Sequence, residues 1–159
     1  NPMGKLPVIE HRGTVVTEAA AICAYLADAF PAKGLAPSPD APERGTYYRW
    51  LFFGAGCIEP AVLDKAFHRP PVERPSSAGY GSYERTMDTL HTVLSKGGFL
   101  VGDAFTAADL YIGAQLDWGM GFGTIESRPA FDRFVAACKA RPGYQRFQAK
   151  HRELMAGMG

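Results

Sequence analysis

Three cysteines and four histidines are the residues of this sequence whose side chains could ligate a metal ion or act as nucleophiles. Cys23, Cys57 and Cys138 are odd in number and widely spaced, with no CxxC pair, and the histidines show no ligand spacing. We therefore expect no metal site and no disulfide framework, which favours a reducing compartment, the cytoplasm. Cys23 has apolar neighbours on a predicted helix, so we interpret it as a buried structural thiol.

A second pattern joins a hydroxyl and a carboxylate within FTAADLYIG. Thr106 and Asp109 are three residues apart, the spacing of a reciprocal N-capping box, with Asp in place of the commoner Glu. The Thr106 hydroxyl is expected to accept from the N–H of Asp109, and the Asp109 carboxylate from the N–H of Thr106. Taken alone, this pattern predicts only the start of a helix.

The elements that position these groups begin with a strand, a turn, a second strand and a helix. Apolar residues at Leu6–Ile9 and Val15–Val16 flank polar residues and Gly13, a pattern typical of an antiparallel hairpin. Thr17 is a candidate N-cap for the helix that follows. Because a lone hairpin is marginal in water, we expect an upstream segment of the same sheet to be missing from the sequence.

Four prolines between Pro31 and Pro42 mark the clearest boundary in the chain. The sequence thus predicts a partial α/β domain at 1–30, a linker at 31–42 and an all-helical domain at 43–159. Within the helical part, apolar spacing and prolines predict a long helix from Pro42, bent near Gly54, and further helices at 83–94, from Thr106, near Pro129 and near Pro142.

Composition excludes several classes of function. The chain has 159 residues and a formal net charge of +1, so no long-range field favours nucleic acid or an anionic membrane. No apolar run approaches the length of a membrane span. We expect neither nucleic acid nor a membrane as a partner.

Two separate groups of motifs resemble the glutathione S-transferase family. The run GGFLVGDAFTAADLYIG, followed downstream by RPGYQRF, is similar to segments of that family's C-terminal domain. The opening NPMGKLPVI and the later TEAAAICAYLAD look like the second half of its thioredoxin-like domain. The resemblance implies a mostly α fold: the C-terminal part of a thioredoxin-like α/β domain, then an all-helical domain whose core helix begins at the capping box.

The resemblance also implies a glutathione site. Pro7 matches the family's cis-proline, which would leave the backbone of Leu6 free to pair with the cysteinyl unit of glutathione. Lys5 could reach the glycyl carboxylate or remain a solvated edge charge.

Thr17, Glu18 and Ala19 form the strand-to-helix turn assigned to the γ-glutamyl group. Glu18 would pair with the ligand's α-ammonium, although by itself it only favours a helix start, and the helix N-terminus would suit the α-carboxylate. Ala19 departs from the serine of many members and removes one hydrogen bond to that carboxylate.

The family places a hydrophobic second substrate between its two domains. Aromatic residues predicted to line that site are Tyr47, Trp50, Phe53, Trp118 and Phe122. The Tyr, Ser or Cys that activates the thiol in the family matches no residue of this chain. The resemblance implies a homodimer that conjugates glutathione to hydrophobic electrophiles. A non-catalytic binding module of the same fold and a helical interaction domain unrelated to glutathione are the alternatives.

Overall fold

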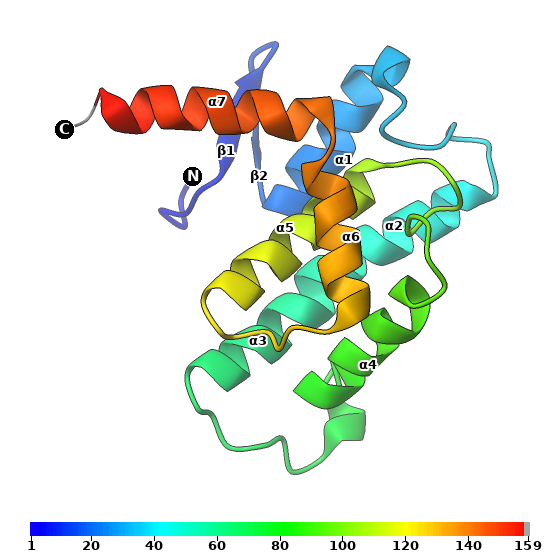
Figure 1. Cartoon of the computed structure of the whole chain (residues 1–159), viewed down its shortest axis with the longest axis vertical. Helices are drawn as coiled ribbons and strands as arrows, with labels where there is room; N and C mark the ends of the chain where they lie inside the picture. Colours follow the sequence, from blue (N-terminus) through cyan, green and yellow to red (C-terminus); the bar gives the residue numbers. More distant parts are fainter. Residues whose placement is uncertain (158–159) are drawn as a thin grey trace.

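The computed structural model describes residues 1–157 as a small β-hairpin attached to a set of helices (Figure 1). The elements, in chain order, are β1 (Val8–His11), β2 (Thr14–Thr17), α1 (Ala19–Ala29), η1 (Pro31–Lys33), α2 (Glu43–Phe53), η2 (Gly54–Ile58), α3 (Glu59–Ala66), η3 (Pro75–Ser77), α4 (Tyr83–Leu94), α5 (Ala107–Gly121), α6 (Pro129–Lys139) and α7 (Pro142–Ala156). The last two residues of the predicted C-terminal domain, 158–159, lie outside this description. Within residues 1–157 no helix is long and apolar enough to cross a membrane.

The hairpin forms as predicted, but β1 begins and ends two residues later than the apolar run Leu6–Ile9, and β2 extends one residue beyond Val15–Val16 on each side. β1 pairs antiparallel with β2 from Val8–Thr17 to His11–Thr14. Arg12 and Gly13 form the two-residue turn, both with positive φ, as a type I′ hairpin requires. The prediction that Thr17 caps the next helix is wrong, because Thr17 is the last residue of β2 and the N-cap position of α1 falls one residue later, at Glu18.

Glu18 is the N-cap residue of α1, and its side chain makes no capping hydrogen bond. From there α1 packs against the central helix α5 through small residues. Ile22 and Ala27 are buried, and Ala20 and Cys23 pack on the same core. Small side chains let the two helices approach closely, which fixes the start of α1 beside α5.

The long helix predicted from Pro42 is interrupted by a wide π-type turn, η2, at the glycines that the sequence marked as a bend. A π turn adds one residue and rotates the face that follows. Here Gly54 is buried, and the next residue, Ala55, is exposed. A Cβ on Gly54 would lie 2.6 Å from Cε1 of Tyr111, so only glycine fits where η2 crosses α5.

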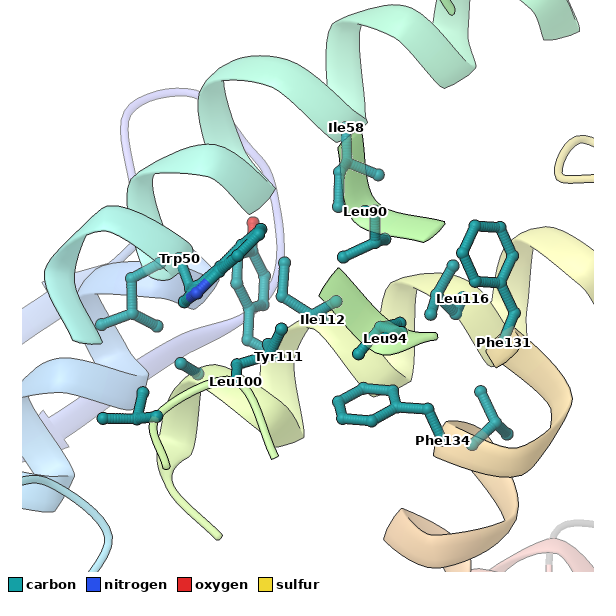
Figure 2. Close-up of a cluster of buried hydrophobic side chains, with 14 of the residues drawn as sticks. Trp50, Ile58, Leu90, Leu94, Leu100, Tyr111, Ile112, Leu116, Phe131 and Phe134 are labelled. Atoms are coloured by element: carbon teal, nitrogen blue, oxygen red, sulfur yellow. The ribbon is translucent and has the colours of Figure 1, made fainter. Parts of the chain in front are cut away.

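The core surrounds α5, with α2, η2, α4 and α6 packed around it (Figure 2). Ile112 and Leu116 of α5 are fully buried, as are Leu90 of α4 and Phe131 of α6. Figure 2 shows these side chains, which come from three separate helices, meeting in the core. The predicted helix starts at Thr106, Pro129 and Pro142 agree with the structure.

The capping box predicted at the start of α5 is present and buried. Asp109 is 0% exposed, and its Oδ2 accepts from the N–H and the hydroxyl of Thr106 at 2.7 and 2.9 Å. Its Oδ1 accepts from the N–H of Leu100 at 2.7 Å, which ties the preceding loop to the helix. Burial raises the pKa of Asp109, and the hydrogen bonds from Leu100 and Thr106 oppose that shift.

Candidate functional site

A cavity of about 890 Å³ lies between the first residues of the chain and the helices of the larger part. Its volume suits a small organic ligand. The residues that line it come from the segment before β1, the start of α1, η2, α3, α5 and the loop after α5. They are Leu6, Pro7, Ala19, Ile58, Glu59, Val62, Leu63, Ala66, Tyr111, Ala114, Gln115, Trp118, Gly119, Phe122 and Thr124.

One wall of the cavity contains three residues predicted to bind glutathione: Leu6, Pro7 and Ala19. The Leu6–Pro7 peptide bond is cis, as the resemblance implies. Leu6 is 85% exposed, and neither its backbone N–H nor its C=O forms a hydrogen bond with any residue in 1–157. A ligand with its own peptide groups can therefore pair with Leu6 as an added strand does.

The other three predicted glutathione ligands, Lys5, Thr17 and Glu18, lie close in sequence to this wall but outside the lining. Glu18 is exposed, and its backbone has φ 66° and ψ 117°. Positive φ is rare for a residue with a Cβ, and such conformations cost of the order of 1–3 kcal/mol and cluster at functional sites. The conformation places the Glu18 side chain at the open N-terminus of α1.

Two of the five aromatic residues predicted to line a hydrophobic substrate site lie in the wall of this cavity. Trp118 of α5 and Phe122, the C-cap residue of that helix, are 71% and 67% exposed, and their ring centroids are 4.8 Å apart at the cavity. The prediction is wrong for Tyr47 and Trp50, which are 0% and 1% exposed in the core. Phe53 is partly buried, packs edge-on against Trp50 and is also absent from the lining.

The sequence analysis missed the polar residues of this cavity, which are Glu59 of α3, Tyr111 and Gln115 of α5, and Thr124 of the loop after α5. Helical spacing predicts the position of two of them, Tyr111 and Gln115. Tyr111, Gln115, Trp118 and Phe122 follow one another at intervals of four, three and four residues, so they share one face of a helix. Once Trp118 is placed at the cavity, Tyr111 and Gln115 belong there too.

None of the three thiols has the environment of an activated nucleophile. Burial raises the pKa of Cys23 to about 11, as the prediction of a structural thiol requires. Burial, with the nearby charge of Asp109, raises the pKa of Cys138 to about 12. The pKa of Cys57 is also raised by burial. The described residues contain no cluster of three or more His, Cys, Asp or Glu side chains that could hold a metal ion.

A second cavity, of about 660 Å³, lies where α7 passes over α5 and α6. Phe105, Leu110, Val135 and Phe147 supply much of its apolar surface, and Lys139 and Asp117 form an ion pair of 2.8 Å at its edge. None of the predicted site residues lines it. The candidate site is therefore the larger cavity beside Leu6.

Comparison with family models gives two matches. Residues 1–29 match the glutathione S-transferase N-terminal domain, and residues 81–142 match the glutathione S-transferase C-terminal domain. The two matches fall on the hairpin with α1 and on the segment from α4 to the start of α7. Residues of both matched segments line the larger cavity.

Individual proteins agree with the family models. Glutathione S-transferase A of Pleuronectes platessa is 29% identical over 155 residues, covering 89% of this chain and 67% of its own length. The chain spans about two thirds of the length of the curated relatives it matches.

Solved structures resemble the chain in fold as well as in sequence. A glutathione transferase from Methylococcus capsulatus is 30% identical with a TM-score of 0.74, covering 91% of this chain and 72% of its own. A sphingomonad glutathione S-transferase complexed with glutathione is 28% identical with a TM-score of 0.72. The match covers 91% of this chain and 73% of that protein. The chain belongs to the glutathione S-transferase family.

Proposed function

We propose that the protein conjugates the thiol of glutathione to hydrophobic electrophiles. The observation that carries this proposal is a single cavity shared by the two halves of the site. Leu6, Pro7 and Ala19 line one wall, and Trp118 and Phe122 line the other. A peptide bound along Leu6 would present its thiol to an apolar ligand held against the aromatic pair.

Glutathione would be held chiefly by backbone groups. The unpaired N–H and C=O of Leu6 match the two peptide groups of the cysteinyl unit. The first N–H groups of α1, at the positive end of the helix dipole, suit the α-carboxylate of the γ-glutamyl unit. Glu18 would receive the α-ammonium, and Lys5, which is exposed, would contact the glycyl carboxylate.

Ala19 weakens this site. Its methyl group replaces a hydroxyl that would donate to the α-carboxylate, and a hydrogen bond to a charged group contributes about 1.5–3 kcal/mol. Substituting Ala19→Ser should therefore tighten glutathione binding by about tenfold or more. We assign the role of thiol activation to none of the residues of this chain, because its cysteines are protonated and lie outside the lining of the cavity.

The domain assignment follows the same family pattern. We propose that residues 1–30 belong to the thioredoxin-like domain, that 31–42 link the domains and that 43–159 form the helical domain. We also propose a cytoplasmic homodimer. The 71% exposed Phe52 on α2 supports an apolar contact between subunits in the region where the family dimerises.

Retention on immobilised glutathione tests the proposal. The protein is expressed from the complete reading frame that contains this sequence, as wild type, Glu18→Ala and Glu10→Ala. Glu10 is an exposed carboxylate on β1 and serves as the matched control. We expect wild type and Glu10→Ala to be retained and Glu18→Ala to be lost. Equal retention of all three would show that Glu18 has no role in binding.

Turnover separates the enzyme from a binding module. Conjugation is followed with an activated aryl chloride under saturating glutathione. Retention on glutathione without conjugation would favour the non-catalytic alternative, which Ala19 already supports. Absence of both retention and conjugation would refute the proposed function.

A further inference from the structure

The larger cavity is lined by one charged side chain, the carboxylate of Glu59 at the start of α3. Among the described residues, no Lys, Arg or His side chain belongs to the lining. Glu59 is exposed, and no ion pair within residues 1–157 includes it. The cavity therefore has a negative charge that this part of the chain does not neutralise.

Stabilisation of the helix does not account for Glu59. A carboxylate in a first helical turn is favourable where the N–H groups of that turn lack partners. The backbone continues from η2 into α3 in helical conformation, and the N–H of Glu59 donates to the carbonyl of Gly54. That carbonyl also accepts from Nε2 of Gln115 at 3.1 Å, which fixes this turn against α5. The backbone of Glu59 is thus held in place, and its carboxylate is free.

The aromatic pair of the cavity also lacks a partner that its rings could hold. Cations stack on aromatic rings elsewhere in the molecule, and Arg49 lies over the other tryptophan, Trp50, at 4.4 Å. Within residues 1–157, no such contact involves Trp118 or Phe122. The face of an indole ring attracts a cation through its quadrupole, more strongly than the face of a phenyl ring does. The cavity thus combines a free carboxylate with free aromatic rings.

The electrostatics of the wall between these groups favour a positive charge. Burial raises the pKa of Tyr111 to about 12, and the negative charges of Glu59 and Glu18 act in the same direction. A metal ion does not fit, because the described residues contain no cluster of three or more His, Cys, Asp or Glu side chains. Hard cations also require several oxygen ligands, whereas most of this lining is apolar. An organic cation satisfies both the charge and the apolar surface.

We propose that the larger cavity binds an organic cation, an ammonium group on an apolar body, with the ammonium between Glu59 and the rings of Trp118 and Phe122. Among hydrophobic electrophiles, the site therefore selects those that carry a positive charge. The role in turnover rests on the proposed glutathione conjugation, whereas binding of the cation does not. Glu59 and Trp118 set specificity, and neither acts on the reacting bond.

Two modest interactions set the size of the expected preference. An ion pair with an exposed carboxylate and a cation over an exposed ring each increase affinity by about two- to fivefold. Together they predict that a cation binds about tenfold more tightly than a neutral compound of the same shape. Salt screens the charge of Glu59, so this preference should decrease as ionic strength rises.

Calorimetric titration without glutathione tests the binding. The ligands are (4-hydroxyphenyl)trimethylammonium and 4-tert-butylphenol, which share one shape and differ in a charged nitrogen against a carbon. We expect wild type to prefer the ammonium about tenfold, and Glu59→Gln and Trp118→Leu each to reduce that ratio of affinities about threefold. Glu84→Gln is the matched control, because Glu84 is an exposed first-turn glutamate of α4 outside the lining. It should keep the wild-type ratio.

The titration has outcomes that would overturn the proposal. Equal affinity of wild type for the two ligands, or no measurable binding of the ammonium, would show that the cavity does not select a cation. An equal fall in the ratio for Glu59→Gln and Glu84→Gln would assign the preference to the overall surface charge. An unchanged ratio in Trp118→Leu would refute the aromatic contact.

Turnover with a matched pair of electrophiles separates this inference from the proposed function. The pair is 4-(trimethylammoniomethyl)benzyl chloride and 4-neopentylbenzyl chloride. The thiol proton of glutathione passes to solvent, the sulfur forms a C–S bond to the benzylic carbon, and chloride leaves with the electron pair of the C–Cl bond. Each kcat/KM is divided by the rate constant of the uncatalysed reaction.

We expect the corrected kcat/KM of wild type to be about tenfold higher for the cationic chloride, and the ratio to fall about threefold in Glu59→Gln. Conjugation of both chlorides with equal efficiency would overturn the cation preference. Failure to conjugate either chloride, with the calorimetric preference intact, would refute the proposed function and support the cation site.

Discussion

Nη2 of Arg44 donates to both carboxylate oxygens of Asp28 at 2.6 Å, which joins the end of α1 to the first turn of α2. The same guanidinium donates to the carbonyl of Pro37 at 2.7 Å and to the hydroxyl of Tyr48 at 2.9 Å. Arg44 is 7% exposed, so one buried cation connects the hairpin end of the molecule, the proline-rich segment and the helical part. Residues from the hairpin end and from the helical part both line the candidate site.

Removing the carboxylate should therefore destabilise the fold. Asp28→Ala leaves the Arg44 charge buried with only neutral partners, and we expect a loss of about 2 kcal/mol in the free energy of unfolding. This is less than for a fully buried pair because the Asp28 side chain is about half exposed. Urea titration measures the change. Asp88→Ala, which breaks the more exposed pair with Arg128, is the control and should cost less than about 1 kcal/mol.

Glu18 has a backbone conformation that is unfavourable for a residue with a Cβ. Glycine tolerates φ 66° and alanine does not, so Glu18→Gly should be about 1 kcal/mol more stable than Glu18→Ala in thermal or urea unfolding. Both variants should lose glutathione binding, because neither has the carboxylate. Equal stability of the two variants would show that the backbone at this position carries no strain.

Asp109 should be the most sensitive polar residue of the helical core. Asp109→Ala leaves the buried N–H groups of Leu100 and Thr106 without acceptors, which should cost about 3 kcal/mol in unfolding free energy. Asp109→Asn keeps one oxygen acceptor and should cost less. A loss below 1 kcal/mol for the alanine variant would mean that water reaches these groups.

The pH dependence of Asp109 has a defined sign. Burial raises its pKa in the folded state above the ordinary value of 3.8, so the folded protein binds this proton more tightly than the unfolded chain does. The stabilisation from Asp109 is largest below that value and is lost as pH rises through the folded pKa. The difference in unfolding free energy between wild type and Asp109→Asn should therefore shrink as pH rises from 4 toward neutrality.

The three thiols should differ in reactivity toward a disulfide reagent at pH 8. The pKa values of Cys23 and Cys138 lie near 11 and 12, so fewer than about 1% of either are thiolate at that pH. Cys57 is the least buried of the three groups, and it should supply the fastest phase. Cys57→Ser should remove that phase. The rates of the slower phases should rise about tenfold for each unit by which the pH is increased, up to about pH 11.

The exposed pair Trp118 and Phe122 should matter to the electrophile but not to stability. Trp118→Ala removes apolar contact area at the cavity, so KM for an apolar electrophile should rise about fivefold or more with little change in the melting temperature. Phe147→Ala is the control, since that aromatic side chain is also exposed but lines the second cavity. A similar rise in both variants would place the electrophile elsewhere.

Sequence reasoning succeeded where the signal is local. Thr106 with Asp109, Pro129 and Pro142 each mark a helix start through their own chemistry, and the structure begins α5, α6 and α7 there. It failed where the answer depends on packing. Tyr47 and Trp118 are both aromatic residues on helices, and only the arrangement of α2 and α5 buries one and exposes the other.

The site illustrates the same limit. Leu6, Pro7 and Ala19 could be placed from their positions in a motif, and all three line the cavity. Glu59 could not be placed, because the π-helical turn η2 changes which face of α3 points toward the cavity, and a regular 3.6-residue period does not predict that change. Tyr111 follows from Trp118 by helical spacing, but only after the orientation of α5 is known.

The contact between Gly54 and Tyr111 has a consequence for how this protein can change. Gly54 is absent from the lining of the cavity, yet any side chain there would push the Tyr111 ring forward and reduce the space beyond it. A substitution at Gly54 can therefore alter ligand preference, although Gly54 itself does not line the cavity.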